Sequence, residues 1–295
     1  MERRVLGNPD LILTSDWHLR EDTPTCRLDD YWAAQWKKVD FVAALQKKYN
    51  CLVLHGGDLY DHWKPSPNLI RETMLHLPES FCTIYGQHDL PQHSLELVHK
   101  CGINVLSTAG YLTILAGTHW GNNPEVPSLI RDYSSTRLNF QILVWHVMNY
   151  SGAKPWPGCL DSSALKLLQK YPQFGLILTG DNHKPFVETY EGRLLVNPGS
   201  LMRMDADQID FKPRVYLWYS ATNTVTPVYL PIDEGVVTRE HIEQKVQREG
   251  RIDAYVSKLD LKWKGEMDYL ENVRILMLKN KTRTSVQQIV YKALD

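Results

Sequence analysis

The sequence has no long apolar run and no large excess of charge of either sign. No stretch approaches the 18 residues of a membrane-spanning helix, and the N-terminus does not combine a basic segment with an apolar one as a secretory signal does. The net charge of −1 over 295 residues creates no overall field that would attract nucleic acid. We therefore expect a globular protein with no membrane partner, in which any affinity for an anionic polymer comes from a local surface.

Cysteine is scarce, and its spacing excludes one class of metal site. The five cysteines are widely separated and form no CxxC pair: Cys26, Cys51, Cys82, Cys101 and Cys159. An odd, scattered set argues against a zinc framework and favours reduced thiols in a cytoplasmic protein. The sequence also lacks a GxxxxGK[ST] phosphate loop, so it predicts no ATPase site of its own.

The distribution of charge and length indicates one large domain with a small addition. Residues 236–295 carry 12 Lys and Arg against 9 Asp and Glu, whereas residues 1–235 carry 21 against 25. The tail is thus mildly basic and the body mildly acidic. We predict a main domain over residues 1–235 and a small C-terminal α/β cap, or a packing appendage, over residues 236–295.

Strands and helices are predicted to alternate through about residue 180, after which strands follow one another. Expected strands lie at 11–13, 52–54, 81–85, 103–106, 111–116, 142–146, 176–178, 186–190, 193–196, 215–219 and 225–230, and expected helices near 30–50, 68–76, 94–100 and 162–170. In the tail, residues 273–278 are predicted as a strand, and Thr284 with Gln287 as the capping box of a last helix. This order predicts an α/β fold of four layers, an αββα sandwich of two mixed β-sheets flanked by helices.

Five of the predicted strands end in residue types that bind metal ions. A single strand end of this kind is as consistent with a simple turn as with a functional site. Five such strand ends, or exits, in one chain predict a cluster of these side chains if the two sheets bring the strand ends to the same edge. Carboxylate and amide oxygens and imidazole nitrogens are donors for divalent cations. In chain order, the exits carry Asp16 and His18, Asp58, Gln87 and His88, His146, and Asp181 and His183.

These blocks resemble a known superfamily. SDWH, GGDLYD, GQHD, WH and GDNH, in this order, resemble the signature blocks of the calcineurin-like metallophosphoesterases, which usually read DxH, GD, GNH[DE], H and GHxH. This likeness covers about residues 10–230. Within the superfamily, TSDWHLR, GDLYD followed by PS, and VNPGSLMRMDADQIDFKPRVYLW resemble the SbcD-type DNA repair exonucleases, the nuclease partners of SbcC-type ATPases. The resemblance implies hydrolysis of DNA phosphodiester bonds by a two-metal-activated water, with an SbcC-type ATPase and a second copy of the chain as candidate partners.

The resemblance also implies a role for each matching residue. It assigns the first metal to Asp16, His18 and His183, the bridge between two metals to Asp58, and the second metal to Gln87, His146 and Asp181. His88 corresponds to the family's non-ligand histidine that faces the scissile phosphate, and Asp89 would hold its other ring nitrogen. Arg203 is a candidate phosphate contact, with an ion pair to Asp205 or Asp207 as the alternative.

Two positions depart from the family pattern, and both belong to the second metal. Gln87 stands where the pattern has Asn, and Asp181 stands where it has His. Both offer oxygen donors, so we expect Mn²⁺, with Mg²⁺ next, in preference to Zn²⁺. The departures leave open a degenerate relative with a weak second site.

Two alternative functions remain open at this point. One is a phosphodiesterase for small molecules of the cyclic-nucleotide type, which uses the same metal blocks. The other is a catalytically silent DNA-binding subunit of an ATPase complex. Tryptophans near the blocks could stack on unpaired bases or simply pack in the core or at its rim: Trp17, Trp63, Trp120, Trp145 and Trp156.

Overall fold

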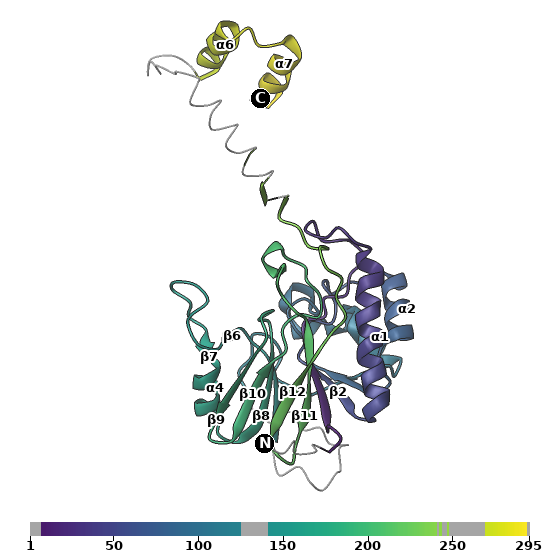
Figure 1. Ribbon diagram of the computed structural model, residues 1–295. Coiled ribbons are helices and arrows are strands. Elements are labelled where there is room, and N and C mark those ends of the chain that lie inside the picture. The colour runs from purple at the N-terminus through teal and green to yellow at the C-terminus, as the bar shows by residue number, and fades with distance from the viewer. Residues whose placement is uncertain (1–6, 125–140, 241, 244–246, 248–268, 294–295) are drawn as a thin grey trace. The chain divides into compact units, whose positions relative to one another are not determined.

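The computed structural model describes residues 7–124, 141–240, 242–243, 247 and 269–293 (Figure 1). The chain divides into two compact units, Met1–Thr238 and Arg239–Asp295. The predicted αββα sandwich is confirmed in the first unit, which contains two mixed sheets with helices on their outer faces. No helix among the described residues is long and apolar enough to cross a membrane.

The first sheet places three of the predicted metal-binding segments on one edge. Its six strands lie in the order β12 (Thr224–Tyr229), β11 (Arg214–Tyr219), β1 (Leu11–Thr14), β2 (Leu52–His55), β3 (Phe81–Thr83) and β4 (Thr113–Ile114). Strands β1 to β4 are parallel, whereas β11 runs antiparallel to both of its neighbours. The carboxyl ends of β1, β2 and β3 therefore meet at one edge, which is where α/β sheets bind ligands.

The second sheet contributes the remaining segments. Its four strands lie in the order β5 (Gln141–His146), β8 (Phe174–Gly180), β10 (Arg193–Asn197) and β9 (Phe186–Tyr190), and only β9 is antiparallel to its neighbour. A separate small pair joins β6 (Asn149–Tyr150) to β7 (Ser162–Ser163). In the register of β5 and β8, His146 lies opposite Gly180, so His146 and Asp181 leave the sheet side by side.

Helices cover the outer face of each sheet, and short polar side chains begin them. In Figure 1, α1 (Tyr31–Tyr49) and α2 (Pro67–His76) cover the first sheet and α4 (Ala164–Lys170) the second. Asp30, Ser66 and Ser163 each accept a hydrogen bond from a backbone N–H in the first turn of the helix that follows. The first unit also contains α3 (Gly102–Thr108) and 3₁₀ turns at Pro91–His93, Leu95–Lys100 and Ala206–Gln208.

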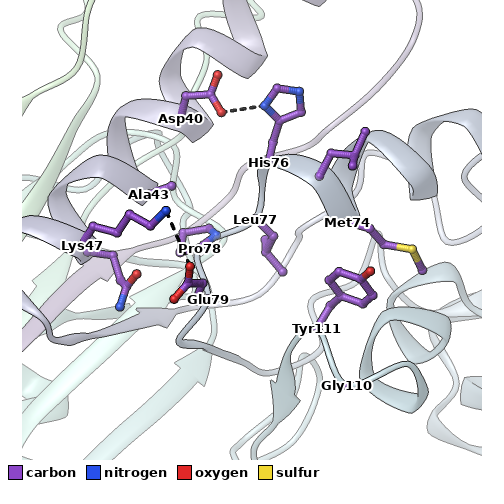
Figure 2. Close-up of a pocket in the computed structure, with 12 residues that line it drawn as sticks. Asp40, Ala43, Lys47, Met74, His76, Leu77, Pro78, Glu79, Gly110 and Tyr111 are labelled. Carbon is purple, nitrogen blue, oxygen red and sulfur yellow. Dashed lines mark hydrogen bonds and ion pairs between the residues drawn. The ribbon is translucent and has the colours of Figure 1, made fainter.

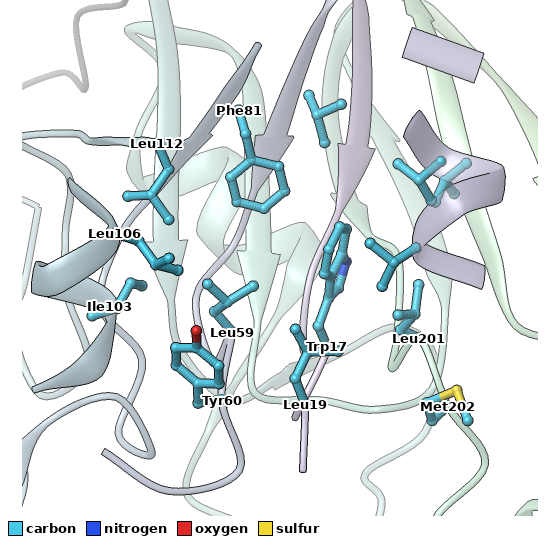
Figure 3. Close-up of a cluster of buried hydrophobic side chains, with 14 of the residues drawn as sticks. Trp17, Leu19, Leu59, Tyr60, Phe81, Ile103, Leu106, Leu112, Leu201 and Met202 are labelled. Carbon is cyan, nitrogen blue, oxygen red and sulfur yellow. The ribbon is translucent and has the colours of Figure 1, made fainter. Parts of the chain in front are cut away.

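Alternating apolar residues build three hydrophobic layers. Leu11 and Leu13 pack between the two sheets, while Ile12 belongs to the cluster beneath the helices of the first sheet. Figure 3 shows part of that outer cluster, where Trp17 and Leu59 pack beside Phe81. Each fully buried side chain of this size stabilises the fold by roughly 1.5–3 kcal/mol. A third cluster lies between the second sheet and α4.

Two predicted strands are helices. Residues 103–106 lie in α3, where Ile103 and Leu106 are buried and Val105 is 47% exposed, which is the spacing of a helix. Residues 273–278 lie in α6 (Tyr269–Lys279), so the described part of the tail is helical. The last helix, α7 (Thr284–Lys292), begins where expected, but the predicted capping box is wrong because Gln287 donates to the Thr282 carbonyl instead.

Candidate metal centre

The structure brings side chains from all five strand exits together. Their potential ligand atoms form three overlapping groups, each within 4.8 Å: Asp16, His18 and His183; His18, Asp58 and His88; and Asp16, Asp58 and His146. Most of these side chains are buried. The two sheets thus bring residues up to 167 positions apart in the sequence, from Asp16 to His183, to one polar cluster.

Asp58 lies at the centre of the cluster. Its Oδ1 accepts the backbone N–H of His88 at 2.8 Å, and its Oδ2 lies 3.3 Å from His146 Nε2 and 3.7 Å from His18 Nε2. Burial would raise the pKa of the Asp58 carboxyl, but the histidines around it outweigh burial and hold this pKa well below its usual range. Oδ2 is therefore an ionised oxygen that faces two imidazoles.

The imidazoles of His146, His18 and His183 lie around the carboxylates of Asp16 and Asp58. The Nδ1 of His146 donates to the Gly56 carbonyl at 2.7 Å, which directs Nε2 toward Asp58. Burial would lower the pKa of His146, but the Asp58 carboxylate raises it to about 10. The Nε2 atoms of His18 and His183 approach to 3.1 Å, with Asp16 Oδ1 about 4 Å from each.

Several buried atoms of the cluster that could bind a metal ion have no hydrogen-bond partner among the described residues: Asp16 Oδ2, Asp58 Oδ2, Gln87 Oε1 and His146 Nε2. Leaving a buried polar atom without a partner costs roughly 1–3 kcal/mol, so a concentration of such atoms needs a compensating ligand. Carboxylate oxygens and imidazole nitrogens are suitable donors for a divalent cation. The donor set therefore fits metal binding.

Strained backbone surrounds these donors. Asp16, His18, Asp58 and Asp181 have φ values of +51°, +45°, +57° and +80°. Non-glycine residues in this region cost about 1–3 kcal/mol each and cluster at functional sites. Close packing adds to the constraint, since a Cβ on Gly86 would lie 2.1 Å from Asp58 Oδ1. The glycine of the GQHD block is thus required for Asp58 to occupy its place.

The two residues that depart from the family pattern contact each other. Gln87 Nε2 donates to Asp181 Oδ1 at 2.8 Å, and the backbone N–H of Asp181 donates to Asp16 Oδ1 at 3.0 Å. Burial and the neighbouring carboxylates of Asp16 and Asp58 raise the pKa of Asp181, although His146 and Gln87 oppose the rise. Asp181 belongs to none of the three ligand groups found among the described residues. Its role as a ligand, like that of Gln87, stays a prediction.

The predicted contact between Asp89 and His88 is wrong. The buried Asp89 carboxylate accepts backbone N–H groups at 2.9–3.3 Å, from Asp58, Leu59, Tyr60 and Gly86. The Nδ1 of His88 instead donates to the Asp61 carbonyl at 2.8 Å. Burial, together with the charge of Asp58, raises the pKa of Asp89 to about 7. Asp89 therefore fixes the turn that carries Asp58 and does not hold the histidine ring.

Asp61, in the turn that follows β2, contacts two histidines of the cluster. Its Oδ1 lies 3.5 Å from His18 Nδ1, its Oδ2 pairs with Arg20 Nη1 at 3.1 Å, and its carbonyl accepts from His88. One residue thus orients two histidines of the cluster. The only signal in the sequence was its spacing of three residues from Asp58, which does not distinguish this role from a simple turn.

The surroundings of Arg203 give no support to a phosphate contact. The side chain is buried, and its two Nη atoms donate to the carbonyls of Ile209 at 3.2 Å and Asp233 at 2.7 Å. Among the residues described, it forms no ion pair with Asp205 or Asp207. Arg203 holds the segment around Asp233 against the body of the first unit, and a substrate contact stays a prediction.

The described part of the first unit also has cavities outside the cluster. One, of about 470 Å³, is lined by the second half of α1, the end of α2 and Gly110–Tyr111, with Asp40 hydrogen-bonded to His76 at its wall (Figure 2). No residue of the metal cluster lines it. Another, of about 310 Å³, is lined by residues that include Arg20, Asp61 and Lys64, so it adjoins the side chain that orients His18.

The first unit is a four-layer αββα sandwich that gathers carboxylates and imidazoles at the carboxyl ends of its strands. Residues 10–185 match the calcineurin-like phosphoesterase family, and because this match spans more than half of the chain, the chain belongs to that family. Members of the family use divalent metal ions, and the described residues include candidate ligands for them.

Solved structures with a similar fold share little sequence with this chain. A novel archaeal phosphodiesterase is 15% identical, with 75% of this chain and 99% of that one covered and a TM-score of 0.40. The protein TT1561 of Thermus thermophilus is 10% identical, with 76% and 99% covered and a TM-score of 0.45. Vacuolar protein sorting 29 from Cryptosporidium parvum is 16% identical, with 76% and 98% covered and a TM-score of 0.36. No curated protein matches the chain.

Proposed function

We propose that the chain is a two-metal phosphodiesterase that hydrolyses DNA as an SbcD-like exonuclease. The observation that supports this proposal best is the buried cluster around Asp58, in which ionised and unpartnered donor atoms from both sheets converge. Divalent cations held by carboxylate and imidazole groups of this cluster, which include Asp16, Asp58 and His146, would activate a water molecule and offset the charge that develops on a phosphodiester under attack.

The residues of the chain have separate tasks in this proposal. Asp58 Oδ2 is shared between the two halves of the cluster, since it faces both His18 and His146. Asp61 and the Gly56 carbonyl keep the imidazoles in position. His88 is exposed, and because its Nδ1 donates to a carbonyl, its Nε2 is the nitrogen left for the substrate; when the ring is doubly protonated, Nε2 can hold a phosphate oxygen or pass it a proton.

DNA as substrate and an SbcC-type ATPase as partner belong to the same proposal. The resemblance of residues 196–218 to the SbcD branch supports DNA. The described helices of the second unit carry large apolar side chains that are exposed, which favours a partner for them: Ile275, Leu278, Val286 and Ile289. A homodimer is the alternative that would also cover them. Mn²⁺ is the proposed metal, and the cytoplasm the proposed compartment.

One observation favours a rival function, a silent DNA-binding subunit. Gln87 Nε2 donates to Asp181 Oδ1, so one of the two carboxylate oxygens that Asp181 could offer the second metal is already engaged. In that case the chain would bind DNA without hydrolysing it. A small-molecule phosphodiesterase, the other rival, would hydrolyse short phosphodiesters but show no salt-sensitive binding of long DNA, because few counterions would be released.

A nuclease assay distinguishes these functions. End-labelled duplex and single-stranded DNA are incubated with wild type in Mn²⁺, Mg²⁺ or Zn²⁺, alongside Asp58→Asn and, as a matched control, the exposed Asp210→Asn. We expect stepwise release of nucleotides by wild type and Asp210→Asn and none by Asp58→Asn, which loses the shared anion. DNA binding without hydrolysis by wild type in every metal would instead identify the silent subunit.

A further inference from the structure

The segment that follows β4 is fixed between two exits of the metal cluster. The N–H of Thr118 donates to the Val144 carbonyl, and the N–H of His146 donates to the Thr118 carbonyl, both at 3.1 Å. Two residues later, the N–H of Trp120 donates to the Tyr85 carbonyl at 3.4 Å. Trp120 is therefore held beside the exits of β3 and β5, which carry Gln87 and His146.

The side chain of Trp120 stays accessible at this place. Trp120 is 37% exposed, and its ring centroid lies 5.1 Å from that of His93 with an interplanar angle of 44°. The Nδ1 of His93 donates to the Gln87 carbonyl at 3.1 Å, which ties this ring to the same exit. Gln92 and His93 reach this arrangement with φ values of +51° and +56°, a strained geometry that tends to occur at functional sites.

The other tryptophans near the blocks do not share this position. Trp17 and Trp145 are buried in the hydrophobic clusters, and Trp63 is partly buried against the first of them. Trp156 is exposed but lies in the loop between β6 and β7. Trp120 is thus the exposed tryptophan that backbone hydrogen bonds hold next to predicted ligands of the second metal.

We propose that Trp120, supported by His93, forms a stacking surface for the unpaired base of the nucleotide next to the scissile phosphate. The inference rests on the proposed phosphodiesterase function and narrows its substrate to nucleic acid with an unpaired end. A planar indole binds the face of any base, so the contact would be insensitive to sequence. It would hold the strand while the phosphate lies at the metal cluster, and a phosphodiester without a base would gain nothing from it.

The backbone contacts make a clean test possible. Backbone N–H and carbonyl groups, and not the indole, position the segment around Trp120. Trp120→Ala should therefore leave the backbone of this segment unchanged, and Trp120→Phe should retain stacking. Tyr111→Ala is a matched control, because Tyr111 is 42% exposed and precedes the amino end of β4, the opposite end of the same strand. Thermal melting of each variant checks the fold.

Kinetics with Mn²⁺ compare a normal single-stranded oligonucleotide with one that carries an abasic residue at each end. We expect Trp120→Ala to raise KM for the normal strand by roughly 5- to 150-fold, the range of one lost base stack, and to leave KM for the abasic strand unchanged. Trp120→Phe should recover most of the loss, and Tyr111→Ala should behave as wild type. An equal loss on both strands, or no loss on either, would overturn the proposal.

Binding measured without hydrolysis separates this inference from the proposed function. Fluorescence anisotropy of both labelled oligonucleotides in EDTA should show that wild type binds the normal strand more tightly than the abasic one and that Trp120→Ala abolishes this difference. If wild type hydrolyses neither strand, the exonuclease proposal fails, yet this difference would still support the stacking surface. If wild type binds both strands equally, the stacking surface is overturned even where hydrolysis is observed.

Discussion

His18 and His88 illustrate how single contacts decide roles within the cluster. Their rings meet edge to face, with centroids 4.7 Å apart, and both are oriented by Asp61, one through its carboxylate and one through its carbonyl. His18 is buried and His88 is exposed. Burial would lower the pKa of His18, but Asp61, Asp58 and Asp16 together raise it. A buried imidazole surrounded by carboxylates suits a metal ion, whereas an exposed one suits the substrate.

The first prediction concerns His88. His88→Ala should lower kcat by ~10²–10⁴ while the bound metal content stays at the wild-type level, because the residue acts on the phosphate and not on the metal. Kinetics and metal analysis of the same preparation provide the measurement, and the exposed His62→Ala is the control. Since His88 lies in a group with His18 and Asp58, loss of one metal equivalent would instead identify it as a ligand.

The second prediction concerns the pair Gln87 and Asp181. With oxygen donors at both positions, wild type should be most active with Mn²⁺, weaker with Mg²⁺ and poor with Zn²⁺. Asp181→His should shift the relative affinity toward Zn²⁺, and Gln87→Asn should weaken activity because the shorter amide loses its 2.8 Å contact with Asp181. Metal titrations that follow activity and stoichiometry test this. A wild type that prefers Zn²⁺, with the order unchanged in Asp181→His, would remove Asp181 from the ligand set.

At the scale of single residues, the sequence predicted which side chains lie together in the cluster but not the backbone conformations and hydrogen bonds that position them. Asp16, Asp58 and His146 follow apolar runs, and parallel strands bring such positions to one edge. The left-handed backbone of Asp16 and Asp58 leaves no mark in the sequence, because aspartate tolerates many turns. Asp89 was assigned to the wrong partner for a related reason, since acceptance of four backbone N–H groups depends on the path of a turn and not on residue type.

At the scale of elements, short apolar runs were the main source of error. Residues 103–106 and 273–278 were predicted as strands, but both lie in helices, α3 and α6. An apolar run of four to six residues fits a buried strand as well as a helix. The helices predicted near residues 30–50, 68–76 and 162–170, which are longer, are confirmed as α1, α2 and α4.

The third prediction concerns α1, which carries a buried lysine. Lys38 is only 3% exposed, and its Nζ contacts the Met202 sulfur at 3.2 Å. Burial, reinforced by Arg27 and Arg203 and only partly opposed by Asp29 and Asp233, lowers the pKa of Lys38 from 10.5 to about 7. Between these two pKa values the unfolded chain holds more protons than the folded one, so stability should rise as the pH rises from about 7 toward 10.5.

Lys38→Met should remove the pH dependence that Lys38 gives to the free energy of unfolding. We expect the variant to be more stable than wild type at pH 6.5, where folded wild type must keep a buried charge, and the gap to shrink at pH 9.5. Urea unfolding at both pH values measures the free energies. Lys37→Met is the control, because Lys37 is exposed and pairs with Asp233 at 3.3 Å. A gap of equal size at both pH values would show that Lys38 does not titrate in this window.

At the scale of the whole molecule, the first unit extends to Thr238 through a segment that is firmly attached. The N–H of Leu28 donates to the Val236 carbonyl at 3.0 Å, and the N–H of Thr238 donates to the Cys26 carbonyl at 2.8 Å. Arg203 holds the Asp233 carbonyl in the same stretch. A truncation that removes the second unit should therefore begin at Arg239, because an earlier cut would also remove contacts that belong to the first unit.

The last prediction concerns that truncation. If residues 239–295 help to bind DNA, their deletion should raise KM for duplex DNA and leave turnover of a small phosphodiester such as bis(4-nitrophenyl) phosphate unchanged. The residues that form the metal cluster all lie in the first unit, so the chemistry should survive. Thermal melting must first show that the truncated chain folds. Once folding is established, an equal loss of activity on both substrates would mean that the second unit supports the fold of the first. An unchanged KM for DNA would instead indicate that the exposed apolar side chains of the second unit bind a protein partner.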